Sequence, residues 1–302
     1  MGRELVVGLV QMRCTDDPQA NLDKALEYVE LAATEGVQVV CLQELFRTLY
    51  FCEREDHDAF ALAEPVPGPS TEVLGAAARR HGMVIVGSVF ERRAPGLYHN
   101  TAVVLDADGR LCGLYRKMHI PDDPGYYEKF YFAPGDLGFR AFRTRHADLG
   151  VCVCWDQWFP EAARLTALAG AELLLYPTAI GHHREQPEAE WRAEAEAWEI
   201  SMRGHAVANG IYVAAANRTG MEGDKCFWGR SFVADPLGAV LERASEDEEE
   251  LLVCALDLDR IERVRQQWPF LRDRRIDAYG ALGQRYLGLP AGPHEPGRAA
   301  AS

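Results

Sequence analysis

The stretch VCVCWDQWFPEAARLTALAG constrains this chain most, because it joins an apolar strand directly to a helix. Apolar residues predict a strand over Leu149 to Val153, and the alanine-rich run that follows predicts a helix beginning near Phe159 or Pro160. Such a succession is typical of an α/β protein. The sharp turn between the two elements carries Cys154, close to helix N–H groups that favour a thiolate. Cys154 is therefore a candidate nucleophile.

The same alternation of strand and helix signals continues along the chain, and no linker divides it. Further helices are predicted over 21–36, with Gly36 at its end, 70–82, with Ser70 or Thr71 as its cap, and 191–210. Further strands are predicted over 5–12, 37–44, 83–92, 171–177 and 211–217, with a hairpin over 97–117 that turns at Asp108-Gly109 and a last strand pair over 230–258. We expect one α/β domain over residues 1–287 and a disordered tail over 288–302, where Pro, Gly and Ala dominate.

Composition excludes several classes of protein. The chain has 302 residues and a net charge of −14, whereas a nucleic-acid partner requires a basic surface. No apolar run approaches the roughly 20 residues that span a membrane, and no N-terminal signal is visible. The eight cysteines show no paired framework, which indicates reduced thiols and a cytoplasmic location.

Three further strand ends or loops carry charged residues that suit catalysis. Glu44 ends an apolar strand in LQELF, where a poorly solvated carboxylate can act as a general base or cap a turn. Lys117 ends GLYRK and either stabilises an oxyanion or lies on the surface. Glu128, among the aromatic residues of GYYEKFYF, either positions that lysine or forms a structural ion pair. With Cys154, this set favours acyl transfer from a C–N bond.

The motifs that contain these residues resemble those of the nitrilase (carbon–nitrogen hydrolase) superfamily. They are QELF, GLYRKMHIPDDPGYYEKFYFAPGD and CWDQWFPEAAR, followed in the same order by YPTAIG, RGHAVANGIYVAAANR and SFVADPLG. The resemblance implies a triad of Glu44, Lys117 and Cys154, with Glu128 orienting the lysine and the Trp155 N–H in the oxyanion hole. It also implies a single-domain α-β-β-α sandwich, no metal or organic cofactor, and a homodimer or larger homo-oligomer.

Within that superfamily, the same motifs are most similar to those of enzymes that hydrolyse N-carbamoylputrescine, which implies a cationic N-carbamoyl amine as substrate. Independently, the segment after Cys154 reads Asp156-Gln157-Trp158 and has no arginine for a substrate carboxylate. The substrate-binding candidates are Tyr50, Trp155, Trp158 and Phe159 as an apolar channel, Ala179 in YPTAIG, and Asp122, Asp123, Asp156 or Glu161 for an ammonium. Each of these acids also suits a turn or a helix start.

Two other interpretations remain open. The same catalytic groups also suit another linear amide, a nitrile or an N-carbamoyl acid, and a relative without activity would serve as an assembly or binding module. The segments HHREQPEAEW and NRTGMEGDKCFWGRSF depart from the subfamily, and we expect both to border the substrate entrance. His182, His183 and Glu185 have no metal-ligand spacing, so a solvated loop is the preferred interpretation there.

Overall fold

A six-stranded sheet forms one half of the protein, for which a computed structural model describes residues 2–288. It contains β1 (Glu4–Gln11), β2 (Val39–Cys41), β3 (Val84–Ala94), β4 (Leu97–Leu105), β5 (Leu111–Arg116) and β15 (Glu250–Asp257), in the order β15-β1-β2-β3-β4-β5. The central strands β1, β2 and β3 are parallel, and the outer pairs are antiparallel. The predicted hairpin turn at Asp108-Gly109 joins β4 to β5, with Gly109 at φ +82°.

A second six-stranded sheet forms the other half. It contains β6 (Ala141–Arg143), β7 (Asp148–Val151), β8 (Leu173–Thr178), β10 (Tyr212–Asn217), β13 (Phe232–Ala234) and β14 (Val240–Arg243), in the order β14-β13-β10-β8-β7-β6. The parallel strands β7, β8 and β10 are connected by α4 (Pro160–Leu168) and α5 (Glu188–Asn209). Helix α5 ends at Gly210, as predicted, because that glycine adopts the left-handed conformation.

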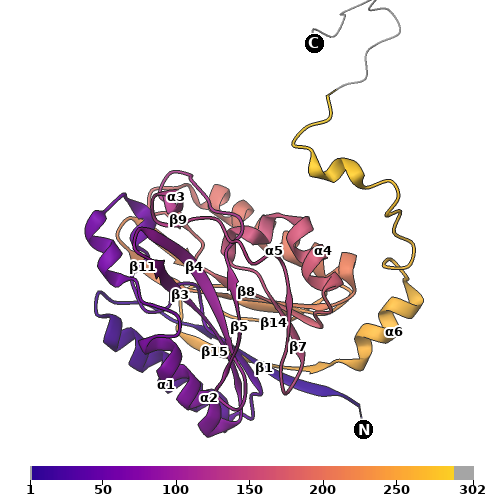
Figure 1. The fold of residues 1–302 in the computed structure, drawn as a ribbon, viewed down its shortest axis with the longest axis horizontal. Coiled ribbons are helices and arrows are strands. Elements are labelled where there is room, and N and C mark those ends of the chain that lie inside the picture. Colours follow the sequence, from indigo (N-terminus) through magenta and orange to yellow (C-terminus); the bar gives the residue numbers. More distant parts are fainter. Residues whose placement is uncertain (1, 289–302) are drawn as a thin grey trace, which may run out of the picture.

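The two sheets lie face to face, with helices on both outer sides. Leu9 and Val39 of the first sheet and Leu174 and Val213 of the second belong to the same buried apolar cluster. Helices α1 (Pro18–Thr34) and α2 (Pro69–His81) pack on the first sheet, while α4 and α5 pack on the second (Figure 1). The predicted α-β-β-α sandwich is confirmed.

A small third sheet lies above one end of the sandwich and contains segments that the sequence analysis left without structure. Its strands are β9 (Gly181–His183), β11 (Thr219–Glu222) and β12 (Lys225–Trp228), in the order β11-β12-β9. The short helices are α3 (Glu128–Tyr131), α6 (Asp259–Gln267), and the 3₁₀ helices η1 (Phe51–Glu53), η2 (His57–Leu62), η3 (Cys154–Trp158) and η4 (Gly280–Gly283).

Three local predictions differ from the structure. The cap of α2 is Gly68, because Pro69 already begins the helix and Thr71 lies inside it, where its hydroxyl bonds the Gly68 backbone. The last predicted strand pair is divided between the sheets: β13 pairs with β14, whereas β15 pairs with β1. His182 and His183 lie in β9, not in a solvated loop, since β12 offers that segment a hydrogen-bonding partner.

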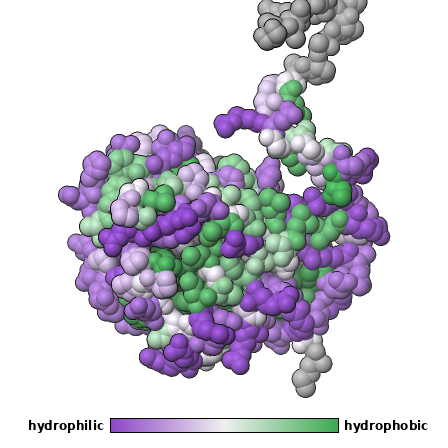
Figure 2. Space-filling model, viewed as in Figure 1, coloured by the Kyte–Doolittle hydropathy of each residue, from purple (hydrophilic) through white to green (hydrophobic). Residues whose placement is uncertain are grey.

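The C-terminal segment after α6 runs away from the sandwich (Figure 1). Figure 2 shows both hydrophobic and hydrophilic residues on it, and its exposed apolar side chains include Trp268, Phe270, Ile276, Tyr286 and Leu287. The predicted disordered tail lies, after its first residue, outside the described residues. Across residues 2–288, no helix is long and apolar enough to cross a membrane.

We predict that His205, on α5, makes folding sensitive to mild acid. Burial lowers the pKa of His205 to about 4, and its Nδ1 lies 3.1 Å from the Tyr176 hydroxyl. Between pH 6.5 and 4 the unfolded chain therefore binds a proton that the folded chain excludes, so the free energy of unfolding falls as pH falls. The contribution is on the order of 3 kcal/mol.

Denaturant titrations of wild type and His205→Gln over this pH range measure that contribution. The variant should lose less stability between pH 6.5 and 4 than the wild type. Parallel pH profiles for the two proteins would contradict the assignment.

Candidate active site

Cys154 lies at the turn between β7 and α4, where the sequence predicts it. The strand ends at Val151, earlier than predicted, and Cys154 begins η3. Its φ is +41°, a conformation that non-glycine residues rarely adopt and that concentrates at functional sites. The side chain is buried within the fold, yet it lines a cavity.

The Asp156 carboxylate stabilises this turn. One oxygen, Oδ2, accepts hydrogen bonds from the Val153 N–H at 2.9 Å and the Tyr115 hydroxyl at 2.7 Å. The other, Oδ1, accepts from the His119 N–H at 3.0 Å and lies 2.7 Å from the His119 ring. Asp156, considered above for a substrate ammonium, is therefore occupied by the protein itself.

The predicted lysine and both glutamates meet beside Cys154. Lys117 Nζ donates to Glu44 Oε1 at 2.8 Å and to the two oxygens of Glu128 at 2.9 and 2.7 Å. All three side chains are essentially inaccessible to solvent. The arrangement brings together residues from the ends of β2, β5 and β7 and from the start of α3.

Burial and neighbouring charges shift the pKa values of these groups. Burial opposes the charge of Lys117, but Glu128 and Glu44 outweigh it and hold the lysine pKa well above its usual value. Burial also raises the pKa of Glu128, against the effect of Lys117. For Cys154, burial and then the Glu44 charge raise the thiol pKa well above its usual value. The resting nucleophile is therefore a thiol, whereas the sequence analysis expected a thiolate, and it requires a base.

Glu44 has one carboxylate oxygen free to serve as that base. Its Oε1 accepts from Lys117 and, at 2.6 Å, from the Asn100 side-chain amide. Its Oε2 is buried and, among the described residues, has no hydrogen-bond partner. A buried carboxylate oxygen that accepts no hydrogen bond is available to accept a proton.

Two residues that the sequence analysis missed fix Glu44 in place. Asn100 orients the carboxylate, and its own Oδ1 accepts from Ser88 Oγ. Arg218, fully buried, donates to the backbone oxygens of Glu44 and Leu45. Asn100 lies in a run of three polar residues, His99 to Thr101, at the start of the otherwise apolar strand β4, and this run was the signal that could have revealed it.

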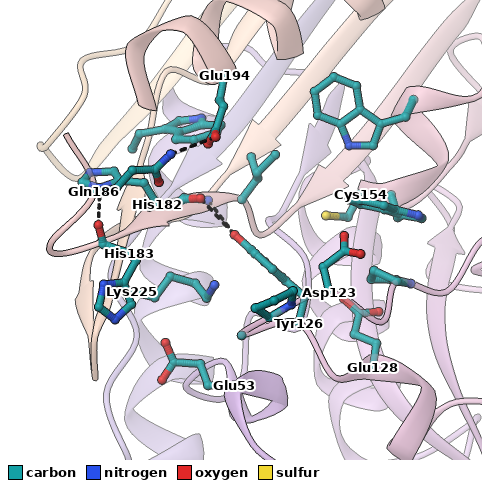
Figure 3. A pocket seen from close by; sticks show the side chains of 18 of the residues that line it. Glu53, Asp123, Tyr126, Glu128, Cys154, His182, His183, Gln186, Glu194 and Lys225 are labelled. Atoms are coloured by element: carbon teal, nitrogen blue, oxygen red, sulfur yellow. Dashed lines mark hydrogen bonds between the residues drawn. The ribbon is translucent and has the colours of Figure 1, made fainter. Parts of the chain in front are cut away.

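Cys154 opens into a cavity of about 670 Å³. Trp155, Trp158, Ile180 and Trp228 supply apolar wall, and the lining residues that can carry charge include Glu53, Asp123, Glu194 and Lys225. In Figure 3, Cys154, Asp123 and Glu128 lie on one side of Tyr126, while His183, Gln186 and Glu53 lie on the other. The cavity is therefore elongated beyond the sulfur and has charged groups away from it.

The predicted substrate-binding residues divide into two groups. Trp155 and Trp158 line the cavity. Tyr50, Asp122 and Ala179 do not line it. The Tyr50 hydroxyl donates to Glu128 at 2.9 Å, and the buried Ala179 places its carbonyl oxygen 3.8 Å from Cys154 Sγ. Asp122 is exposed, whereas its neighbour Asp123 lines the cavity wall.

The remaining candidates from the sequence are either exposed to solvent or packed against other side chains. Glu161 is exposed, and Phe159 stacks on the His119 ring with centroids 3.7 Å apart. His182 stacks on Trp191, and residues 2–288 contain no group of three or more side chains suited to a metal ion.

Known proteins with the same architecture define the class. Residues 6–266 match the carbon-nitrogen hydrolase family, so the chain belongs to that family. It is 44% identical to the N-carbamoylputrescine amidase of Solanum lycopersicum over 93% of this chain and 95% of that protein. It is 38% identical to the citrullinase of Francisella tularensis over 93% and 98%. A carbon-nitrogen hydrolase from Helicobacter pylori G27 superposes with a TM-score of 0.91 at 46% identity, over 94% and 100%. The protein is an amidohydrolase that acts on C–N bonds other than peptide bonds.

We predict that Asn100→Ala lowers turnover on the order of 10²-fold, because Glu44 loses a charge-assisted hydrogen bond and its fixed orientation. Steady-state ammonia release measures this effect. The matched control is Thr101→Ala, which removes an equally buried hydroxyl that bonds Glu91 outside the site. Equal losses of turnover in the two variants would show that Asn100 only supports the fold.

Proposed function

We propose that this enzyme hydrolyses the ureido C–N bond of a linear N-carbamoyl amine, with N-carbamoylputrescine as the first candidate. The observation that carries the proposal is the cavity that opens at Cys154. Its inner wall is apolar, its charged lining includes the carboxylates of Glu53, Asp123 and Glu194 and the ammonium of Lys225, and its described lining includes no arginine. The apolar wall and the three carboxylates suit an apolar chain that bears an ammonium at its far end. The similarity to the tomato N-carbamoylputrescine amidase supports the same substrate.

In the first half-reaction, Cys154 attacks the carbonyl carbon of the urea. Glu44 Oε2 takes the thiol proton as the S–C bond forms, and the carbonyl oxygen becomes negative. Lys117 stabilises that oxyanion together with the Trp155 N–H, which as the second residue of η3 has no acceptor inside its helix. The tetrahedral intermediate then expels the terminal amine, which receives the proton from Glu44 and leaves as ammonia.

In the second half-reaction, water replaces ammonia. Glu44 takes a proton from this water, its oxygen attacks the carbonyl carbon of the S-carbamoyl enzyme, and the C–S bond breaks with the proton returned to Cys154. The released N-substituted carbamic acid decomposes to the amine and carbon dioxide. One urea and one water thus give one amine, one carbon dioxide and one ammonia.

Glu128 acts through Lys117 in this proposal. It contacts the lysine with both oxygens and is itself bonded by the Tyr50 hydroxyl. Because Lys117 is held from two sides, its ammonium does not have to reorganise when the oxyanion forms. Tyr50 and Glu128 are thus positioning residues, although Glu128 also reaches the cavity wall.

Citrulline is a second candidate substrate, since a citrullinase is among the relatives. Citrulline is N-carbamoylputrescine with a carboxylate added to the carbon that bears the amine. The two candidates share the reacting group and the chain, so the distinction depends on the far end of the cavity.

We further propose that the enzyme works as a homodimer or larger homo-oligomer. The C-terminal segment exposes large apolar side chains, with Ile276 74% and Leu287 67% exposed in the single chain. Contact with a second copy would remove this surface from water. Light scattering of the full chain tests the assembly, and a monomeric mass at micromolar concentration would contradict it.

We predict that Cys154→Ser retains the fold but loses turnover on the order of 10³-fold or more, because an alcohol is a far weaker nucleophile near neutral pH. Ammonia release from a panel of carbamoyl amines, carbamoyl acids, amides and nitriles measures both activity and preference. Cys152→Ser is the matched control, since this neighbouring thiol is equally buried but outside the site. A preference for amides or nitriles over every urea, or substantial turnover by Cys154→Ser, would overturn the proposed function.

A further inference from the structure

Lys225 carries a buried positive charge that the proposed reaction does not use. It belongs to β12, is only 5% exposed, and lines the cavity with its ammonium directed toward Tyr126 (Figure 3). Its Nζ lies 3.3 Å from the centroid of the Tyr126 ring and 5.9 Å from that of Tyr50. Among residues 2–288, no carboxylate oxygen lies within 4.0 Å of this ammonium and no acceptor bonds it.

The comparison with Lys117 shows what Lys225 lacks. Lys117 is even more deeply buried, but it contacts two carboxylates, which keep it charged. Lys225 has no such partner, and burial lowers its pKa to about 8. Contact with an aromatic ring recovers only part of the free energy that removing an ammonium from water costs. Lys225 is still mostly charged at neutral pH, so an anion in the cavity would supply the missing partner.

Glu53 provides the complementary charge on the same wall. Its carboxylate is half-buried, and burial raises its pKa while the charge of Lys225 lowers it. The two groups therefore interact through space without forming an ion pair. Lys225, Glu53 and Cys154 line the same cavity. One small molecule can thus place its carbonyl at the sulfur and its charged end at Lys225 and Glu53.

We propose that the Lys225 ammonium binds a substrate carboxylate. Among linear N-carbamoyl amines the enzyme consequently prefers ureido α-amino acids, whose far end carries both a carboxylate and an ammonium, over N-carbamoylputrescine, the candidate that sequence similarity supports. The substrate carboxylate contacts Lys225, and the ammonium lies on the Glu53 side. An ω-ureido amine without a carboxylate places its only charge beside a like charge and leaves Lys225 without a partner. This inference rests on the proposed cleavage of ureas at Cys154 and specifies the substrate class.

Three ureas of one chain length separate the contributions of the two head groups. N-Carbamoylputrescine carries the amine, 5-ureidopentanoate carries the carboxylate, and L-citrulline carries both. The measured quantity is kcat/KM for each, expressed as the ratio of citrulline to N-carbamoylputrescine. We expect the wild type to prefer citrulline, and Lys225→Met to lower this ratio on the order of 10²-fold, since a charge-assisted contact is lost.

Two further variants control the experiment. Lys225→Arg keeps a cation and should restore the ratio to within about tenfold of wild type. Lys24→Met removes an ammonium that pairs with Glu249 far from the cavity, and should leave the ratio unaltered. Thermal unfolding checks each variant, and the wild-type ratio tests the inference even if Lys225→Met does not fold.

The outcomes distinguish this inference from the proposed function. Efficient hydrolysis of N-carbamoylputrescine with no turnover of citrulline or 5-ureidopentanoate would overturn the carboxylate site and leave the proposed function standing. An equal ratio in wild type and folded Lys225→Met would do the same. Absence of turnover for all three ureas, with activity on simple amides, would overturn the proposed function and with it this inference.

Discussion

The ammonium of Lys117, shared between two buried carboxylates, is the interaction on which the rest of the site depends. Three ionisable side chains without access to water are tolerable only because each satisfies the others. The sharing also sets the chemistry. It fixes a positive charge near the reacting sulfur, occupies Oε1 of Glu44, and leaves Oε2 to move a proton. Burial, and then the negative charge of Glu44, raise the pKa of Cys154. In the proposed mechanism, attack therefore depends on proton transfer to Glu44 at the moment of reaction and not on a thiolate formed beforehand.

The sandwich brings this cluster together because its members follow strands of both sheets. Glu44 and Lys117 come after β2 and β5 of the first sheet, whereas Cys154 comes after β7 of the second. A shift of one sheet against the other would separate the sulfur from its base. Two hydrogen bonds between elements of the two sheets oppose such a shift. The Tyr115 hydroxyl of β5 donates to Asp156 of η3, and Arg218, which follows β10, donates to the backbone oxygen of Glu44. The strain at Cys154 is thus supported by polar contacts from the opposite sheet.

Local signals in the sequence were enough to predict the helices, the strands and the position of the nucleophile. They were not enough to predict which residues contact one another across the fold. The hairpin at Asp108-Gly109 and the end of α5 at Gly210 depend on a few adjacent residues. The pairing of β15 with β1 depends on residues about 250 positions apart, and it was missed. Asp156 illustrates the same limit: a carboxylate near a helix start is ambiguous until Tyr115 and His119 are seen to bond it. In the sequence, Lys225 stood out only as part of a divergent segment, because the burial of a lysine side chain becomes known only from the structure.

The central claim is that Cys154 forms a covalent bond to the carbonyl carbon of a urea. Rapid acid quenching of the wild-type enzyme during turnover of N-carbamoylputrescine or citrulline, followed by peptide mass spectrometry, tests it directly. The account predicts an S-carbamoyl adduct on the peptide containing Cys154, which appears within one turnover and disappears when substrate is exhausted. Turnover without any adduct on that peptide, or an adduct confined to another cysteine, would contradict it.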